Sequence, residues 1–242
     1  MYYFLMNLFE WQDEVLKKLG DKLDDFYLAG GTALAKFYFH HRESYDLDFF
    51  TQKYSISKVE EAVRILTRET GKTMKLKTRR DQAGRKIARG RIYEMILGPK
   101  VEQDLKIDFF QDVLPLLKPF KKVDGIDILS REDIYLRKIY AISGNPVEQD
   151  RVGKKRFLGG RQEARDLYDL YVLSSSFQNL SIFMSKHCEA WMKEGVIAWF
   201  HHFNRTEMKM GLTDIRTSNT IEFALMDRHF AKEIDRLIGG MS

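Results

Sequence analysis

Hydrophobic positions in the first half of the chain alternate between the spacing of helices and the spacing of strands. Leu8, Trp11, Val15, Leu16 and Leu19 recur every three or four residues, which predicts one buried helix face. Runs that are apolar or that alternate in polarity predict strands at 26–29, 45–50, 73–79, 86–97 and 102–110. Helical spacing returns at 32–41 and 57–70. Helices and strands in this order indicate an α/β arrangement.

Two local signals refine these elements. Ser57 with Glu60 three residues later is typical of an N-cap, so the second of these helices is expected to start there. The turn-forming segment 81–84 lies between the strand-like runs 73–79 and 86–97, which are therefore expected to form a hairpin.

The pattern changes near residue 130 and is helical almost throughout the remainder. Candidate helices lie at 130–143, 161–175, 178–193 and 219–238. Only four prolines occur, and no linker rich in glycine, serine or proline divides the chain. The change of pattern predicts an α/β domain at 1–129, followed by a helical C-terminal half at 130–242.

Composition and charge narrow the class of protein. Hydrophobic residues make up 44% of the 242 residues and charged residues 31%, which excludes an intrinsically disordered chain. The formal net charge of +5 permits a polyanionic partner. Cys188 is the single cysteine, so the sequence favours a reducing compartment, with the cytoplasm as the expected location. No apolar run reaches the length of a membrane span, and no membrane partner is expected.

Acidic side chains on predicted strands are the first candidates for chemistry. The period of two along a strand places Asp46 and Asp48 on one face. Two carboxylates this close repel each other unless a cation lies between them, and Mg²⁺ prefers such ligands together with substrate phosphates. Asp108 lies on the polar side of another strand, next to Lys106. The alternative is that all three aspartates are ordinary solvated strand residues.

A glycine pair precedes these acids. Gly30, Gly31 and Thr32 lie where a predicted strand passes into a predicted helix. Glycines at such a turn let the backbone approach a phosphate, and the Thr32 hydroxyl could add a hydrogen-bond donor. A tight turn with an ordinary N-cap explains the same residues. The spacings of the P-loop and of the Rossmann glycine motif do not occur, and the six histidines lack the spacing of a zinc site.

The combination of motifs resembles the AbiEii/AbiGii toxin family of the polymerase-β-like nucleotidyltransferase superfamily. The resemblance rests on residues 30–35 (GGTALA), 41–50 (HRESYDLDFF) and 164–170 (ARDLYDL), which occur in the family's order. Residues 132–141 (EDIYLRKIYA) are similar to the family's lysine motif. Together these motifs span most of residues 25–175.

The resemblance implies a role for each matching residue. Gly30, Gly31 and Thr32 would bind phosphate. Asp46, Asp48 and Asp108 would be the catalytic, metal-binding carboxylates. Lys138 would contact the triphosphate, and Asp166, near Asp169, would be the last acidic position of the site. Arg42 either contacts phosphate or pairs with Glu43. From the residues alone, Lys138 is expected to extend from an apolar helix, and Asp166 and Asp169 to form surface pairs.

The resemblance also implies a fold and an activity. The expected fold is α+β, a nucleotidyltransferase domain with a mixed sheet flanked by helices, followed by the helical C-terminal half. The expected reaction transfers a nucleoside monophosphate from a nucleoside triphosphate (NTP) to a hydroxyl, with Mg²⁺ or Mn²⁺, as the toxin of a bacterial toxin–antitoxin or abortive-infection phage-defence system. An RNA such as a tRNA end is the expected acceptor, and an antitoxin protein the expected partner. Two alternatives stay open: an inactive RNA- or partner-binding module, and a small-molecule nucleotidyltransferase of the antibiotic-modifying type.

Two basic clusters bear on the acceptor. The first cluster lies along residues 75–91 of the predicted hairpin, where Asp81 is the single acidic residue. Its members are Lys75, Lys77, Arg79, Arg80, Arg85, Lys86, Arg89 and Arg91. Such a hairpin follows an RNA backbone, collects the triphosphate or is a solvated face, and it lacks interleaved aromatic residues that would stack on bases. The second cluster, within 151–161, is interpreted as a loop over the site.

Overall fold

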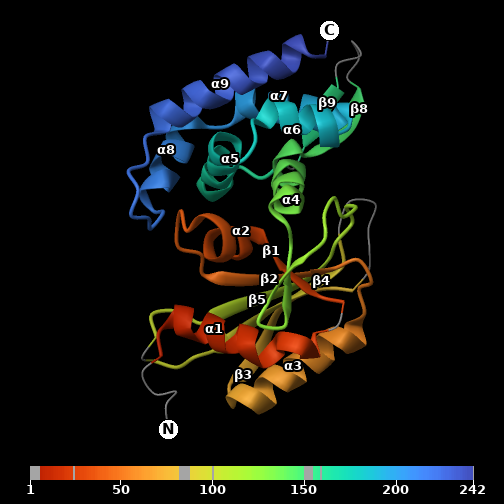
Figure 1. The fold of residues 1–242 in the computed structure, drawn as a ribbon, viewed down its shortest axis with the longest axis vertical. Helices are drawn as coiled ribbons and strands as arrows, with labels where there is room; N and C mark the ends of the chain where they lie inside the picture. Colours follow the sequence, from red (N-terminus) through yellow and green to blue (C-terminus); the bar gives the residue numbers. More distant parts are fainter. Residues whose placement is uncertain are drawn as a thin grey trace. The chain divides into compact units, whose positions relative to one another are not determined.

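The computed structural model describes residues 6–23, 25–81, 88–99, 101–149, 155–158 and 160–241. The chain divides into two compact units (Figure 1). Unit 1 comprises Met1–Tyr38 and Ser44–Arg131, and unit 2 comprises Phe39–Glu43 and Glu132–Ser242. The short segment Phe39–Glu43 therefore belongs to the helical unit, although residues on both sides of it belong to unit 1.

Over its described residues, unit 1 contains a seven-stranded mixed sheet with the order β3-β4-β5-β2-β1-β7-β6. The strands are β1 (Tyr27–Ala29), β2 (Asp46–Thr51), β3 (Thr73–Arg80), β4 (Gly90–Ile96), β5 (Leu105–Gln111), β6 (Lys121–Val123) and β7 (Ile126–Ile128). Strand β2 runs parallel to β5, and β1 runs parallel to β7, whereas the other neighbours are antiparallel. The predicted mixed sheet is confirmed, and so is the antiparallel pairing of β3 with β4. Most of the turn predicted at 81–84 lies outside the described residues.

Alternation along the central strands separates an apolar face of the sheet from a polar one. Leu47, Phe49, Ile107 and Phe109 are fully buried, and the rings of Phe49 and Phe109 stack with centroids 5.5 Å apart. Helices α1 (Leu8–Leu19) and α3 (Ile56–Thr70) lie side by side and cover this apolar face (Figure 1). Because successive side chains point to opposite faces, the intervening charged residues of β2 and β5 lie on the other face.

Two helix starts differ from the expected ones. Helix α2 (Gly30–Leu34) begins at the first glycine and continues as a π-helical turn, Ala35–Phe39. Helix α3 begins at Ile56, so Ser57 lies inside it and the predicted N-cap is wrong. The Glu60 carboxylate instead lies 2.9 Å from Nη1 of Arg91 on β4. The buried Arg91 guanidinium requires a countercharge, and Glu60 contributes to it instead of capping the helix.

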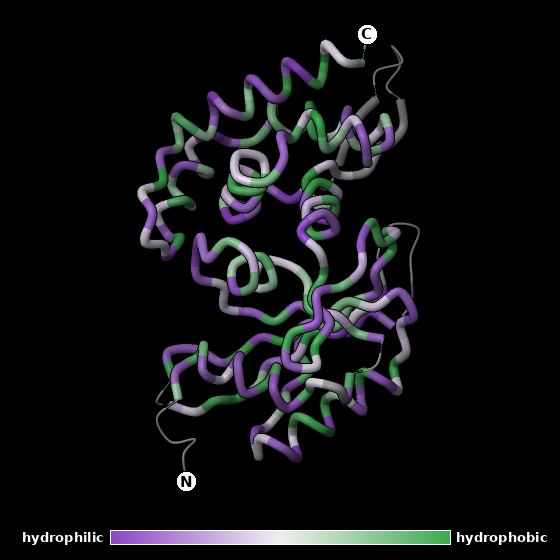
Figure 2. The backbone as a smooth tube through the Cα atoms, viewed as in Figure 1, coloured by the Kyte–Doolittle hydropathy of each residue, from purple (hydrophilic) through white to green (hydrophobic). Residues whose placement is uncertain are grey.

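In its described residues, the regular structure of unit 2 is helical apart from one hairpin. Its helices are α4 (Arg131–Ser143, whose first residue belongs to unit 1), α5 (Ala164–Ser176), α6 (Leu180–His187), α7 (Ala190–His202), α8 (Arg205–Thr213) and α9 (Phe223–Gly239). Hydrophobic and hydrophilic residues alternate along α9 (Figure 2), which buries Met226, Phe230, Ile234 and Leu237. This spacing of three or four residues explains why the C-terminal helix was predictable. The expected helical C-terminal half is confirmed.

Three features of unit 2 differ from the predictions. The single helix expected at 178–193 is two helices, which are separated at Cys188 by extended backbone that no proline or glycine marks. Helix α8 was not predicted, although Asn204 caps it by accepting hydrogen bonds from the backbone N–H groups of Thr206 and Glu207. The hairpin of β8 (Asn145–Gln149) and β9 (Lys155–Leu158) occupies part of a stretch that was expected to be a loop. Within the part of the chain that the structure describes, no helix is long and apolar enough to span a membrane.

Candidate active site

The polar face of the central strands gathers the three strand aspartates. In the parallel pairing of β2 with β5, Asp48 lies opposite Asp108 and Asp46 lies opposite Lys106. Paired residues of neighbouring strands project to the same face, so the aspartates and the lysine form one charged patch. The predicted placement of Asp108 on a strand beside Asp46 and Asp48 is confirmed.

Asp108 is the most enclosed member of this patch. Its side chain is only 4% exposed, its Oδ2 lies 2.7 Å from the Lys106 ammonium, and its Oδ1 is buried with no hydrogen-bond partner. Burial raises the pKa of the Asp108 carboxyl, and the Lys106 hydrogen bond offsets this only in part. Burial acts to lower the pKa of Lys106, but the charges of the aspartates outweigh it and raise that pKa.

Gly30 lets the backbone lie against the Asp48 carboxylate. Its φ of +69° is strained for any residue with a side chain. A Cβ at this position would lie 2.9 Å from the Asp48 Cγ. The Thr32 hydroxyl is buried; it donates to the main-chain carbonyl of Asp46 and lies 2.8 Å from Ser44 Oγ, within hydrogen-bond distance. Thr32 therefore fixes the start of β2, where the first aspartate lies.

The chemistry of these residues fits a divalent cation. Among the described residues, no three His, Cys, Asp or Glu side chains converge tightly enough to hold a metal ion by themselves. Mg²⁺ needs only one or two carboxylates when substrate phosphates complete its coordination. Asp46 and Asp48 could supply these ligands. The unpartnered oxygen of Asp108 and the ammonium between Asp46 and Asp108 both indicate a place that favours positive charge.

The other predicted site residues lie in unit 2, within a buried network of ion pairs around Asp169. Arg42 binds Asp169 through two parallel hydrogen bonds, Nε to Oδ1 at 2.6 Å and Nη2 to Oδ2 at 2.8 Å. His41 Nε2 lies 2.8 Å from Oδ1, and the Lys138 ammonium lies 2.6 Å from Oδ2. Burial opposes ionisation of Asp169, but the charges of Lys138 and Arg42 hold its pKa well below the usual range.

This network changes the interpretation of four residues. The predicted exposed positions of Lys138, Asp166 and Asp169 are wrong, because all three are buried. Lys138 also lies 2.7 Å from Asp166, whose Oδ1 accepts a hydrogen bond from Arg161 at 2.8 Å. Arg42 binds Asp169, and it contacts Glu43 only through the main-chain carbonyl. Contact of Arg42, Lys138 or Asp166 with a nucleotide stays a prediction.

The basic hairpin is partly neutralised by its own unit. Arg91 is buried against Asp81 and Glu60, while Lys77 pairs with Glu94 at 2.9 Å. Lys75 and Arg80 are exposed on β3, which is an edge of the sheet. Arg85 and Lys86 lie outside the described residues, as do Arg151 and Lys154 of the second basic cluster.

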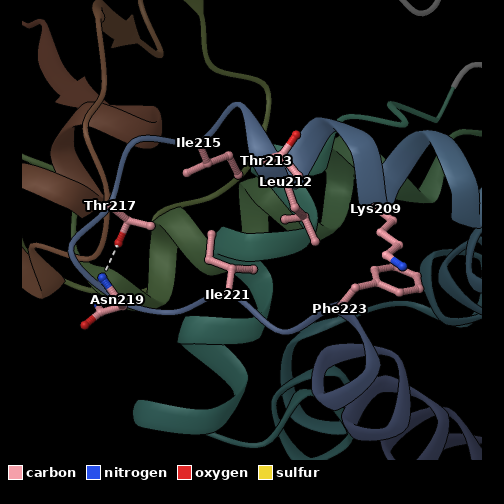
Figure 3. Close-up of a pocket in the computed structure, with 8 residues that line it drawn as sticks. All are labelled: Lys209, Leu212, Thr213, Ile215, Thr217, Asn219, Ile221 and Phe223. Atoms are coloured by element: carbon pink, nitrogen blue, oxygen red, sulfur yellow. Dashed lines mark hydrogen bonds between the residues drawn. The ribbon is translucent and has the colours of Figure 1, made fainter.

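A pocket of about 320 Å³ lies in unit 2 between α8 and the segment that follows it (Figure 3). Its lining is mixed, with apolar Leu212, Ile215, Ile221 and Phe223 and polar Lys209, Thr213, Thr217 and Asn219. The Thr217 hydroxyl donates to the main-chain carbonyl of His41 at 2.7 Å. One wall of the pocket therefore holds the segment that carries His41 and Arg42.

Comparisons with known proteins agree with this architecture. A family model described as "Nucleotidyl transferase AbiEii toxin, Type IV TA system" matches residues 15–238. The solved structure of JHP933 from Helicobacter pylori is similar with 18% identity and a TM-score of 0.53, over 97% of this chain and 93% of that one. An H. pylori protein described as a "putative nucleotidyltransferase" is similar with 18% identity and a TM-score of 0.54, over 95% and 94% of the two chains. The search of curated proteins found no significant match.

Proposed function

Because this chain belongs to the nucleotidyl transferase AbiEii toxin family, we propose that it transfers a nucleoside monophosphate from an NTP to a hydroxyl group with the help of Mg²⁺ or Mn²⁺. The hydroxyl oxygen attacks the α-phosphate, loses its proton, and expels pyrophosphate as the bond between the α- and β-phosphates breaks. The observation that carries the proposal is the face on which Asp46, Asp48 and Asp108 lie on adjacent parallel strands, next to Gly30. The catalytic domain is assigned to residues 1–129, and the helical domain to residues 130–242.

Each residue of this face has a distinct task in the proposed reaction. Asp46, Asp48 and Asp108 would hold the metal ions, and Asp108 would also orient the acceptor hydroxyl. Gly30 and Gly31 let the backbone approach the triphosphate, while Thr32 fixes the strand that carries both metal ligands. A bound divalent ion neutralises the triphosphate and lowers the pKa of the attacking hydroxyl. The protein then contributes mainly by positioning the reactants.

The residues of the Asp169 network enter the proposal through the family resemblance. Arg42, Lys138 and Asp166 are assigned to the nucleotide, and the ion pairs that they form keep each side chain in one position. Such preorganisation reduces the entropy that a charged side chain loses when it binds a phosphate.

The family also suggests the biological setting. A type IV toxin–antitoxin system pairs the enzyme with an antitoxin protein, as expected for bacterial phage defence by abortive infection. An RNA such as a tRNA end is proposed as the acceptor, and exposed Lys75 and Arg80 on the edge strand support a polyanionic partner. NTPs and RNA coexist in the cytoplasm, which is the proposed location.

The test is to incubate the purified protein with each α-labelled NTP, Mg²⁺, and separate pools of total RNA, total protein and small hydroxyl compounds. We expect label from one NTP to enter RNA, and we expect chelation of the metal to prevent this. A γ-labelled NTP is the matched control, because transfer of a nucleoside monophosphate releases the γ-phosphate and leaves RNA unlabelled.

The other outcomes separate the alternatives. Label in a small-molecule pool would favour an enzyme of the antibiotic-modifying type. NTP binding by equilibrium dialysis with no label in any pool contradicts catalysis by this chain on its own. Absence of NTP binding would favour an inactive binding module.

Substitution of Gly30 by Ala is expected to reduce transfer by about a hundredfold, the usual cost of misplacing a catalytic group by roughly 1 Å. The added Cβ would lie 2.9 Å from the Asp48 Cγ, so the carboxylate must move. The positive φ adds a strain of about 1–2 kcal/mol. Label incorporation and a thermal melt of the same sample measure the two effects.

Gly71→Ala is the matched control. Gly71 has a similar φ of +65°, but a Cβ there would meet no atom within 4 Å. This variant should lose a similar amount of stability and keep its activity. Equal activity losses in the two variants would show that backbone strain, rather than displacement of Asp48, causes the defect.

A further inference from the structure

The position of Lys106 suggests a role that the proposed reaction does not itself require. Its ammonium lies 2.7 Å from Asp108 Oδ2 and 3.9 Å from Asp46 Oδ2. The Lys106 ammonium thus lies between Asp46 and Asp108, two of the carboxylates that the proposed reaction uses. The strand register produces this placement, because Lys106 is opposite Asp46 and two residues before Asp108.

The ammonium compensates for charge that the fold places together. Asp46, Asp48 and Asp108 share one face of adjacent strands, where like charges destabilise one another. Asp108 is nearly inaccessible to water, so the solvent can neutralise its charge only weakly. Without a nearby cation, the repulsion between these carboxylates would destabilise the folded protein.

The same ammonium can also leave. The Lys106 side chain is 47% exposed, and it extends from a strand face rather than from the core. A divalent ion that takes the place of the ammonium supplies the countercharge that buried Asp108 needs, so the Lys106 side chain can turn into water without leaving that carboxylate uncompensated. A divalent ion close to Asp46 and Asp108 would repel the ammonium strongly at this distance.

We propose that Lys106 is an internal counter-ion, which occupies the place of a cation between Asp46 and Asp108 in the substrate-free protein and swings away when the metal–NTP complex binds. This proposal rests on the proposed function. Lys106 is accordingly a positioning residue: it keeps the carboxylates together without a metal, and it weakens metal binding until the phosphates of the NTP contribute further ligands.

The test measures Mn²⁺ binding without nucleotide, by loss of the electron paramagnetic resonance signal of free Mn²⁺. Lys106→Met should bind Mn²⁺ about five- to tenfold more tightly than the unmodified protein, since no ion pair has to break. Lys106→Arg should restore weak binding. With a non-hydrolysable NTP present, the difference between Lys106→Met and the unmodified protein should shrink.

Lys122→Met is the matched control. Lys122 also pairs with an aspartate on a neighbouring strand, Asp127 at 3.2 Å, but on the β6–β7 edge. Its Mn²⁺ affinity should equal that of the unmodified protein. Thermal melts add a second readout: Lys106→Met should melt at a lower temperature than the unmodified protein without metal, and Mn²⁺ should stabilise it more.

The outcomes distinguish this inference from the proposed function. If the unmodified protein binds Mn²⁺, Asp48→Asn does not, and Lys106→Met binds equally or more weakly, the role of Lys106 is overturned and the metal site stands. If neither the unmodified protein nor Lys106→Met binds Mn²⁺ with or without NTP, the proposed metal site fails and the inference fails with it.

Discussion

Asp48→Asn is expected to abolish nucleotidyl transfer and leave the protein folded. Asp48 lies opposite Asp108 and against the backbone of Gly30. Loss of a metal ligand from a reaction that depends on charge neutralisation should reduce the rate by about a thousandfold or more. The same change removes one of three repelling carboxylates, so the melting temperature of the metal-free protein should stay unchanged or rise.

Label incorporation and thermal melts measure this pair of effects. Asp127→Asn is the control, because Asp127 is also a strand aspartate of unit 1 but pairs with Lys122 on the β6–β7 edge. It should keep full activity. Transfer at the unmodified rate by Asp48→Asn would place the chemistry elsewhere, and unfolding of this variant would mean that Asp48 is a structural residue.

The second large effect is expected in unit 2, where Asp169→Asn should destabilise the helical unit by about 3–5 kcal/mol. Asp169 is fully buried and accepts contacts from Arg42, His41 and Lys138. An amide of the same shape removes the carboxylate that Arg42 binds, and it leaves Lys138 with the carboxylate of Asp166 alone. Folded proteins have a total stability of about 5–15 kcal/mol, so urea unfolding followed by circular dichroism should move to a much lower midpoint.

The effect should depend on pH in a defined direction. Despite its burial, the Asp169 carboxyl has a pKa well below the usual range because of Lys138 and Arg42. In an unfolded chain the aspartate carboxyl has a pKa of about 3.9. Between these two pKa values the unfolded chain binds more protons than the folded one. The contribution of Asp169 to the free energy of unfolding is therefore complete above the unfolded pKa, and it is lost as pH falls through the folded pKa.

The stability difference between Asp169→Asn and the unmodified protein should therefore be largest at neutral pH and decrease in acid. Asp235 is an exposed aspartate of α9, and Asp235→Asn is the control. It should change the free energy of unfolding by less than about 0.5 kcal/mol both at neutral pH and in acid. Unfolding of Asp169→Asn at the same urea concentration as the unmodified protein at neutral pH would contradict a stabilising role for the network.

Sequence periodicity predicted most accurately the helices and strands that bury only one face. Helix α1 matches its predicted face of Leu8, Trp11, Val15, Leu16 and Leu19, all of which are buried. Strand β2 alternates as predicted, with Leu47 and Phe49 fully buried and both aspartates on the other face. In each element a single face packs against the core, so a local pattern carries enough information.

The helical half was harder to predict because tertiary contacts define several of its boundaries. The start of α6 is fixed by Glu233 of α9, which accepts hydrogen bonds from the backbone N–H and the hydroxyl of Ser181 at 2.9 and 2.7 Å. Glu233 is far from α6 in sequence, so no local pattern reveals this contact. Helix α8 is different: its Asn204 cap with Glu207 three residues on was a local signal that the sequence offered.

The amino-acid sequence alone was sufficient to predict helix α1, strands β1 to β5 and the C-terminal helix, and its short motifs identified the family and the candidate residues. Hydrophobic period and short motifs are local properties of the chain. Which charges meet depends instead on the fold. The register of β2 against β5 brings Lys106 between Asp46 and Asp108, and the packing of unit 2 joins Arg42 to Asp169 across 127 residues. Electrostatic energies depend on distance and burial, and both are set by packing between segments that are remote in sequence.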